Sequence, residues 1–356
     1  MEPTPALTPK VPQTHFYSVH KMISDPFELG ENRLRKEVLR HHAKKVLLQL
    51  PEGLKPVGPR LATVIEDAGA TAIISADPCY GACDLPLCEA ESLGVDLIVH
   101  YGHTKMMEKS RFRLPVVYIE AKAKVAVKTA VEKAIGKLKS WTRIGLATTA
   151  QHTHMIDEAR EILSKAGKTV YVGDSDHAKS PGQVLGCDYV TAKSVSDEVD
   201  AFLFVGGGRF HAMGLHLATM KPTVVADPFE NRAYSIQADA QKVVKRRWAE
   251  ISEAREAEEF GVIIGLKPGQ CNIEVAYGIK QALEENGKSA ALLALREITS
   301  TALLQFPTIE AYVNTACPRI ALDEPSFSTK PVLTVREAYV VLGKIGWEDL
   351  LEHGFI

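Results

Sequence analysis

Short apolar runs that end in turn residues recur along the chain at intervals of about one hundred residues. Three of them open successive copies of one pattern: VLLQLPEG from Val46, RIGLATTAQ from Arg143 and GVIIGLKPGQ from Gly261. Apolar runs bounded by proline and glycine are typical of buried parallel strands. Each copy continues with a helical pattern that ends at a glycine, at positions 69, 167 and 287. Glycine favours the left-handed position that closes a helix.

Three further strands are predicted in each copy. A second strand follows the closing glycine directly, as TAIISAD, KTVYVGD and KSAALLAL. The third strands begin at Val95, Val199 and Ile309, and the fourth open with prolines 20, 23 and 22 residues later, at Pro115, Pro222 and Pro331. Strands that alternate with helical patterns indicate parallel sheets. The sequence therefore predicts an α/β protein of three pseudo-repeated domains, each a small parallel four-stranded sheet flanked by helices.

The same pattern sets the expected boundaries. Residues 1–28, with proline at positions 3, 5, 9 and 12, are expected to form a flexible tail. Domain 1 is expected at 29–140, domain 2 with a connecting helix at 141–255, and domain 3 at 256–356. The charged stretch from Asn231 to Phe260 predicts a long helix that joins the second and third domains. We interpret it as a solvated connector with charge pairs three and four residues apart; the alternative is that its basic start contacts a partner.

Composition excludes several classes of protein. The chain has 42 Lys and Arg against 44 Asp and Glu, a net charge of −2, and a pI near 6.6, which disfavours nucleic acid as its main partner. It contains no run of uncharged apolar residues long enough to span a bilayer, and its start lacks the basic and apolar regions of a signal peptide. Its six cysteines then indicate a reducing compartment, where thiols serve metals or catalysis. We expect a cytoplasmic protein without a nucleic-acid or membrane partner.

Cysteine occurs near the carboxyl edge of each predicted sheet, which is where ligands bind in open parallel sheets. Cys83 and Cys187 each precede the third strand of their domain by 12 residues, whereas Cys317 lies 8 residues after the start of its third strand. If the three domains turn these edges toward a common axis, one thiolate from each reaches a shared centre. Three thiolates leave a metal with an open position for a substrate.

Two alternatives to this shared centre remain open at this point. A free cysteine is often only a small buried hydrophobe. Cys79, Cys83 and Cys88 also form a local C-x3-C-x4-C pattern, one residue away from the C-x3-C-x2-C loop of conventional radical S-adenosylmethionine enzymes. A local site of that kind leaves Cys187 and Cys317 unexplained.

Glycine and histidine provide weaker signals at the same edge. Gly206, Gly207 and Gly208 follow a strand and offer backbone amides to an anion or nucleotide, but no G-x-G-x-x-G or G-K-[ST] pattern supports a dinucleotide or Walker site. The pairs His152/His154 and His211/His216 have the residue type for metal binding. Because no carboxylate or cysteine lies at ligand spacing, solvated loop histidines are the favoured interpretation.

Six motifs together resemble the archaeal diphthamide biosynthesis protein 2 family, over residues from about 30 to about 340. They are specific as a set, and they are LPEGL at 50–54, DPCYGACD at 77–84, HYGH at 100–103, GQVLGC at 182–187, VGGGRFH at 205–211 and NTACPRIALDE at 314–324.

The resemblance implies that one cysteine per domain, at Cys83, Cys187 and Cys317, holds a 4Fe-4S cluster. It further implies that the unique iron engages S-adenosylmethionine, whose Cγ–S bond is cleaved by one electron to give methylthioadenosine and a 3-amino-3-carboxypropyl radical. The radical adds to the imidazole C2 of a histidine in translation elongation factor 2, the first step toward diphthamide. A homodimer and an external electron donor are also implied. On this basis Cys79, Cys88 and Cys271 are expected not to be ligands of the cluster.

Three loops are expected to hold the amino-acid and nucleoside ends of S-adenosylmethionine. They are the loops of Pro51, Glu52 and Gly53, of Gly206, Gly207 and Gly208, and of Gly269 and Gln270. Arg319 is expected to contact the methionyl carboxylate, because guanidinium and carboxylate pair in a fork. The alternative for Arg319 is a structural ion pair.

Two other functions compete with this interpretation. Quinolinate synthase, which the three-domain plan also resembles, is an iron–sulfur dehydratase that does not use S-adenosylmethionine. A non-catalytic iron–sulfur electron carrier, or a zinc protein, is the second alternative. Spectra under reduction separate them, because zinc is silent and a carrier changes its redox state without consuming a cofactor.

Overall fold

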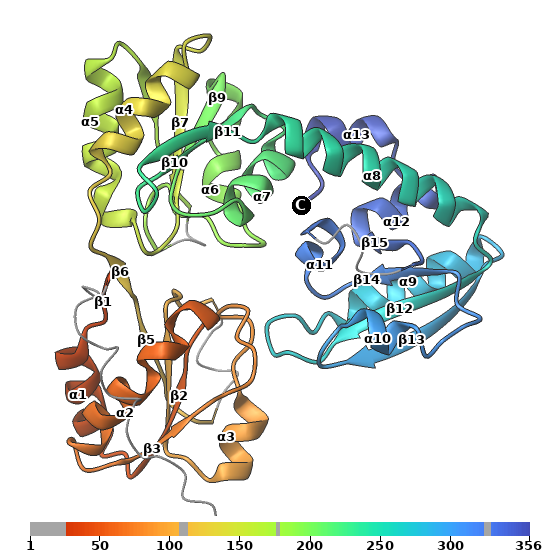
Figure 1. The fold of residues 1–356 in the computed structure, drawn as a ribbon. Helices are drawn as coiled ribbons and strands as arrows, with labels where there is room; N and C mark the ends of the chain where they lie inside the picture. The colour runs from red at the N-terminus through yellow and green to blue at the C-terminus, as the bar shows by residue number, and fades with distance from the viewer. Residues whose placement is uncertain (1–25, 107–112, 176–178, 324–328) are drawn as a thin grey trace, which may run out of the picture.

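Three α/β units, each built on its own sheet, make up the molecule. The computed structural model describes residues 26–106, 113–175, 179–323 and 329–356. Figure 1 shows three lobes that follow one another along the chain. In each lobe the parallel strands lie in the order second, first, third, fourth. The prediction of three related α/β repeats is confirmed.

Unit 1 contains a parallel sheet in the order β3-β2-β4-β5. Its buried first strand and the apolar faces of the flanking helices form one core that includes Leu48, Leu61 and Val99. The strands are β2 (Lys45–Gln49), β3 (Thr71–Ile74), β4 (Leu97–Tyr101) and β5 (Val116–Ile119), and the helices are α1 (Glu31–Arg40), η1 (Glu52–Val57), α2 (Gly58–Glu66) and α3 (Leu87–Leu93).

Unit 2 departs from the predicted four parallel strands. Its sheet has the order β11-β10-β9-β7-β8, and the additional edge strand β11 pairs antiparallel with β10. The strands are β7 (Arg143–Thr148), β8 (Thr169–Tyr171), β9 (Ala201–Val205), β10 (Thr223–Asp227) and β11 (Arg232–Ser235). The helices are α4 (Lys128–Lys137), η3 (Thr153–Met155), α5 (Ile156–Lys165), α6 (Val190–Lys193), η4 (Ser196–Glu198) and α7 (Phe210–Thr219).

A hairpin turn explains why the sequence prediction was wrong at β11. Asp227 Oδ1 accepts hydrogen bonds from the Phe229 and Glu230 amides at 3.0 and 3.2 Å, and Asn231 has a positive φ of 48°. Short acceptor side chains and asparagine favour such a turn. The predicted long helix therefore begins later, as α8 (Gln237–Glu256), after the strand instead of at Asn231.

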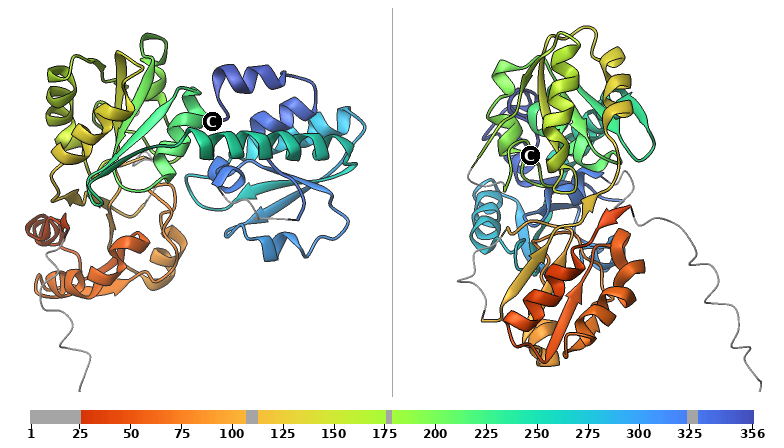
Figure 2. Two further views of the ribbon diagram at one scale, coloured as in Figure 1. Left: turned by 45° about the horizontal axis from the view of Figure 1, so that its top comes forward. Right: turned by 90° about the vertical axis from the view of Figure 1, so that its left-hand side faces the viewer.

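Unit 3 follows α8, which crosses from the second lobe to the third (Figure 2). Its sheet is fully parallel, in the order β13-β12-β14-β15. Residues of α8 such as Ile251 and Ala254 pack into the core of this unit, so one face of the connector is buried. The strands are β12 (Glu259–Gly265), β13 (Ser289–Leu295), β14 (Ala311–Asn314) and β15 (Val332–Thr334), and the helices are α9 (Ile273–Glu285), α10 (Ser300–Leu303), α11 (Pro318–Asp323), α12 (Val335–Val341) and α13 (Trp347–His353).

An acidic residue before the third strand performs the same task in every unit. Asp96 accepts hydrogen bonds from the amides of Lys44 and Lys45 at 2.8 and 2.9 Å, where the first strand begins. Asp200 accepts from the two amides at the start of β7, and Glu310 from the two at the start of β12. Each acid ties the start of the first strand to the start of the third, which fixes the register of the carboxyl ends at the opposite edge.

Two elements lie across the domain boundaries expected from the sequence. Residues 1–25 of the predicted tail lie outside the described residues, but Phe27 and Glu28, which also belonged to it, form β1 (Phe27–Glu28) and pair with β6 (Lys122–Ala123). Helix α4 precedes the expected boundary at 140, and its apolar face packs in the core of unit 2. No helix in the described segments combines the length and the hydropathy needed to cross a bilayer.

Candidate metal centre

The three cysteines predicted to share a centre lie near enough for their charges to affect one another. Cys83 lies between β3 and α3, Cys187 between β8 and α6, and Cys317 directly before α11, and all three are partly buried. Burial, followed by the charges of Cys317 and Cys83, raises the pKa of Cys187 to about 12. Burial also raises the pKa of Cys317, and the charge of Cys83 adds to that effect. Free thiolates are unfavourable at this place, whereas a bound cation reverses the balance.

The loop of Gly269 and Gln270, which we predicted to bind a cofactor, lies against Cys83. The Gly269 amide donates to the Cys83 carbonyl oxygen at 2.8 Å, and Gln270 Nε2 lies 3.3 Å from Cys83 Sγ. A Cβ at position 269 would stand 2.7 Å from that of Cys83, so only glycine permits this approach. Unit 3 thus positions the thiol of unit 1.

A buried ammonium, which sequence analysis missed, joins the same two units. The Nζ of Lys267 donates to Asp84 at 2.9 Å and to Glu297 at 2.7 Å, and lies 4.0 Å from the centre of the Tyr80 ring. Lys267 and Asp84 are each only 4% exposed. Because Asp84 follows Cys83 directly, the ion pair fixes the loop that presents this thiol.

A pocket of about 240 Å³ lies between units 1 and 2. Three of the residues predicted to bind the cofactor line it, namely Pro51, Gly53 and Gly207. The other lining residues are Phe27, Leu54, Gly102, Ala121, Thr149, Gln151, His152, His211 and Phe229.

The pocket histidines differ from their predicted state. His152 is buried instead of solvated, and its Nε2 has no hydrogen-bond partner. Burial lowers the pKa of His152 to about 4 and that of His211 to about 3, so both are neutral at pH 7. His211 and His216 lie on α7 and are partly buried, whereas His154 is exposed, as predicted.

Three other predicted residues use their polar groups within the protein. The Gly206 amide donates to the Ala226 carbonyl oxygen at 3.1 Å, and the Gly208 amide to Asp227 Oδ2 at 3.3 Å. Glu52 Oε1 accepts hydrogen bonds from the Cys79 amide and from Lys55, both at 3.1 Å. Cofactor binding by these residues stays a prediction.

The contacts of Arg319 favour its structural alternative. The side chain is buried and pairs with Asp323, with a shortest distance of 2.6 Å. Its Nη2 also donates to the Phe210 carbonyl oxygen at 2.7 Å, and its guanidinium lies 4.0 Å from the centre of the Phe210 ring. Arg319 therefore connects unit 3 with α7 of unit 2, and a contact with a substrate carboxylate remains a prediction.

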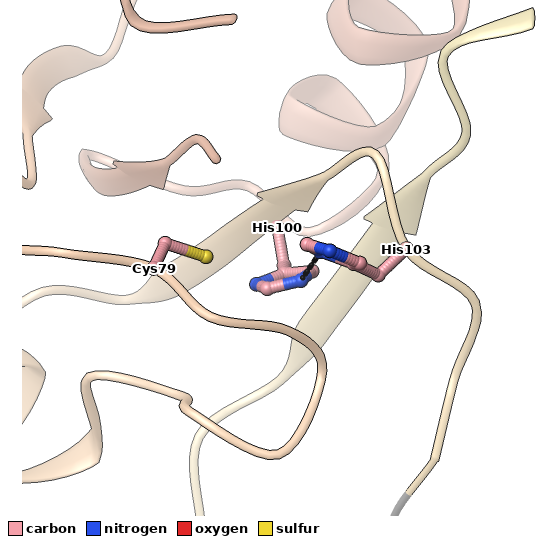
Figure 3. Close-up of side chains that lie close together, drawn as sticks. All are labelled: Cys79, His100 and His103. Atoms are coloured by element: carbon pink, nitrogen blue, oxygen red, sulfur yellow. Dashed lines mark hydrogen bonds between the residues drawn. The ribbon is translucent and has the colours of Figure 1, made fainter. Parts of the chain in front are cut away.

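The remaining cysteines do not behave alike. Cys88 and Cys271 are exposed, whereas Cys79 is buried. Burial raises the pKa of Cys79 to about 12. Figure 3 shows Cys79 beside His100 and His103, and one ligand atom from each lies within 4.8 Å of the others. This group contains neither Cys83 nor Cys88.

The donor set at the shared edge fits an iron–sulfur cluster. Three thiols from three units converge in partly buried surroundings, and an amide N–H group lies within reach of one sulfur atom. Clusters are held by thiolates and tuned by hydrogen bonds to sulfur. The fold and the site therefore define a three-unit α/β protein with a candidate iron–sulfur centre.

Comparison with known proteins identifies the family. The family model for diphthamide synthesis proteins matches residues 50–351, which is most of the chain, and the chain belongs to this family. It is 38% identical over 318 residues to the 2-(3-amino-3-carboxypropyl)histidine synthase of Pyrococcus horikoshii, covering 89% of this chain and 91% of that protein. It is 31% identical to subunit 1 of the Schizosaccharomyces pombe synthase, covering 97% of this chain and 78% of that protein.

A solved structure agrees with this assignment. The crystal structure of Dph2 from Pyrococcus horikoshii with a 4Fe-4S cluster matches with a TM-score of 0.82 and 36% identity, covering 92% of this chain and 93% of that one. The resemblance noted in the sequence is confirmed at the level of the family and the fold.

Proposed function

We propose that this protein transfers the 3-amino-3-carboxypropyl group of S-adenosylmethionine to a histidine of translation elongation factor 2, as the first step of diphthamide synthesis. The activity is the one for which its Pyrococcus relative is named, 2-(3-amino-3-carboxypropyl)histidine synthase. The observation that carries the proposal is the meeting of Cys83, Cys187 and Cys317 from three separate units. Three thiolates leave one iron of a four-iron cluster without a protein ligand.

The cluster, when bound, supplies the single electron that breaks the Cγ–S bond of S-adenosylmethionine and releases methylthioadenosine. The protein orients this reaction through groups that surround Cys83. Gln270 Nε2 donates a hydrogen bond toward the sulfur atom, and the buried ammonium of Lys267 places a positive charge behind Asp84. Both groups favour the reduced, more negative state of a thiolate-bound centre.

The pocket between units 1 and 2 is our candidate for the bound S-adenosylmethionine. Pro51, Gly53 and Gly207 leave room for the ligand without adding side-chain polar groups. The unpartnered Nε2 of His152 offers one hydrogen bond to a polar group of the ligand. In the target histidine a C–C bond replaces the C2–H bond, so one proton and one electron leave the imidazole, and the oxidised cluster would be the acceptor of that electron.

The protein substrate and the setting belong to the same proposal. We infer that elongation factor 2 presents its histidine to this edge, that an external donor supplies the electron, and that two copies of the chain form a homodimer in the cytoplasm. A reduced compartment suits the six free thiols.

Product analysis tests the proposed activity. The iron-reconstituted protein would be incubated without oxygen with S-adenosylmethionine, a strong reductant and elongation factor 2. Mass spectrometry should find methylthioadenosine and a histidine in the factor that has gained the 3-amino-3-carboxypropyl group. Cys187→Ser should abolish both products, whereas Cys88→Ser, which changes an exposed cysteine, should leave them unchanged.

The competing functions give different results in the same experiment. Recovery of intact S-adenosylmethionine from a protein whose cluster is present and reducible would favour the dehydratase or the electron carrier. Release of 5′-deoxyadenosine would instead indicate the conventional bond cleavage. Loss of the cluster in Cys79→Ser, with retention in Cys187→Ser, would replace the shared centre by the local cysteine loop.

A further inference from the structure

A second group of metal-ligand side chains lies beside the three-cysteine centre. His100 is the fourth residue of β4, and His103 follows the turn at Gly102, where φ is 80°. Cys79 approaches both imidazoles from the loop after β3 (Figure 3). One ligand atom of each lies within 4.8 Å of the others. The three residues come from two segments of unit 1, so the sequence spacing alone does not reveal them.

Hydrogen bonds behind His100 leave its Nε2 unprotonated, with a lone pair that accepts from His103 and that a cation could take instead. Gln49 Nε2 donates to the Asp84 carbonyl oxygen at 2.6 Å, so Gln49 Oε1 is the atom that faces His100 Nδ1, also at 2.6 Å. His100 Nδ1 therefore carries the proton, and Nε2 presents a lone pair toward His103 Nδ1, 2.9 Å away. Ligating histidines in metalloproteins are oriented by an outer hydrogen bond of this kind.

The charges around the group also suit a dication. Cys79 brings one thiolate to the ion, and the buried imidazole of His100 and the partly buried one of His103 are neutral ligands. The carboxylate of Glu52 accepts a hydrogen bond from the Cys79 amide at 3.1 Å, so a second negative charge lies next to the first. Lys55 Nζ lies 3.1 Å from the same carboxylate and offsets its charge, so the Cys79 thiolate is the charge that a divalent ion would neutralise.

We propose that Cys79, His100 and His103 bind one divalent ion of the zinc class, at a site distinct from the three-cysteine centre. One sulfur and two nitrogen ligands are a set that zinc prefers, with the fourth tetrahedral position left for water or a further ligand. At metal–ligand distances of about 2.0–2.3 Å, ligand atoms lie about 3.3–3.6 Å apart, so the imidazoles separate slightly and the sulfur moves inward.

Such an ion joins the loop that leads to Cys83 to the end of β4. The hydrogen bond between Gln49 and the Asp84 carbonyl oxygen connects this site with the residue after Cys83. The ion therefore adds a second anchor to the segment that presents the thiol of unit 1. It has no part in the proposed transfer chemistry.

Metal analysis of the cluster-loaded protein tests the site. A filled cluster keeps zinc from the thiols of the shared centre, so the protein would be loaded with iron first, dialysed against Zn²⁺ and then against metal-free buffer. We expect about one zinc and about four iron per chain. Cys79→Ser and His103→Ala should reduce zinc at least tenfold and keep the iron, while Cys88→Ser should change neither metal. Absorption at the zinc edge should show one sulfur and two nitrogen neighbours.

Each other result has a defined meaning. Zinc below about one tenth per chain in the parent protein, or zinc that persists in Cys79→Ser and in His103→Ala, would overturn the proposal. If iron falls together with zinc in Cys79→Ser, Cys79 belongs to the iron centre, and the ligand set of the proposed function changes too. Cys79→Thr and His103→Asn, checked by circular dichroism, repeat the test if the first variants do not fold.

Discussion

At the scale of single residues, Arg247 shows how a charge is kept inside unit 3. Its side chain is 0% exposed and forms a two-pronged pair with Glu337, at 2.7 and 2.6 Å. Glu250 and the carbonyl oxygens of Ala321 and Val332 accept its other hydrogen bonds. Since Arg247 belongs to α8, the network fixes the connecting helix to the body of the third unit.

Removal of this guanidinium should destabilise the unit strongly. Arg247→Met leaves the buried Glu337 carboxylate without its cation, which costs about 3–5 kcal/mol of unfolding free energy. Urea unfolding followed by the fluorescence of Trp248 and Trp347, which contact one another, measures the loss. The control is Arg143→Gln, at a half-exposed pair with Asp200, where the loss should be far smaller because solvent screens the two charges.

A second variant separates charge from packing. Arg247→Met combined with Glu337→Gln should recover much of the stability, because no buried charge then remains and the acceptor for the Thr334 amide is kept. If the double variant is no more stable than Arg247→Met alone, lost packing and not the unpaired carboxylate explains the effect.

At the scale of elements, the three sheets solve one packing problem in two ways. The problem arises where the first strand of each sheet lies beside the third. In unit 1 the paired residues there are Leu47 and Ile98, two side chains of similar size. At the same register, unit 2 pairs Gly145 with Phe202, and unit 3 pairs Gly261 with a tyrosine, Tyr312. A glycine beside an aromatic ring replaces two aliphatic side chains.

Exchange of that glycine should therefore be costly. A Cβ at position 145 would stand 2.3 Å from the Phe202 ring, so Gly145→Ala should lower stability by about 1–3 kcal/mol, through overpacking. Thermal unfolding measures the loss, and Phe202→Leu added to Gly145→Ala should restore part of it. Gly136→Ala, in α4 with nothing within 4 Å, should instead stabilise by about 0.4–1 kcal/mol. Equal effects of the two alanines would refute this packing argument.

Sequence analysis found the elements that have a local apolar pattern and missed those that depend on contacts distant in the sequence. The first strand of each unit is a buried apolar run between turn residues, and such a run is visible in one dimension. Strand β11, Arg232–Ser235, was missed because its side chains are only partly buried at a sheet edge and resemble a charged helix start. The structural role of Asp96, Asp200 and Glu310 was not recognised. Each accepts hydrogen bonds from amides about fifty residues earlier in the chain, and no local pattern reveals such a contact.

The candidate site divides in the same way. The placement of Cys83, Cys187 and Cys317 at the carboxyl edges was predictable from the strand pattern, whereas their sharing of one cluster stays a prediction. The pair of Lys267 and Asp84 spans 183 residues, and no local pattern indicates it. Gly206 to Gly208 had the composition of an anion site, yet two of those amides donate within unit 2, which only the fold reveals.

At the scale of the whole molecule, each pair of units meets through polar contacts near the shared centre. Gln151 of unit 2 donates to the Gly102 carbonyl oxygen of unit 1 at 2.8 Å. Arg319 connects unit 3 with unit 2, and Lys267 connects unit 3 with unit 1. The Lys267 and Arg319 contacts each bring a buried charge close to a cysteine of the centre, so they link assembly to its chemistry.

Replacement of Lys267 should therefore change both stability and redox behaviour. Lys267→Met leaves Asp84 buried without its cation, which costs about 3–5 kcal/mol. The lost positive charge near Cys83 should also lower the reduction potential of the bound cluster, because reduction adds negative charge there. Thermal unfolding and a spectroscopic redox titration of the iron-loaded protein measure the two effects.

Neutralisation of the partner decides whether charge is the cause. Lys267→Met combined with Asp84→Asn removes one positive and one negative charge, so the local net charge stays that of the parent. Stability and reduction potential should both return toward the parent values. Arg296→Gln, at the partly exposed pair between Arg296 and Glu89 that also joins units 3 and 1, should shift stability by no more than about 1 kcal/mol. A potential that stays low in the double variant would mean that Lys267 acts through the geometry of the Cys83 loop. The electrostatic account of this contact would then be wrong, even if the stability had recovered.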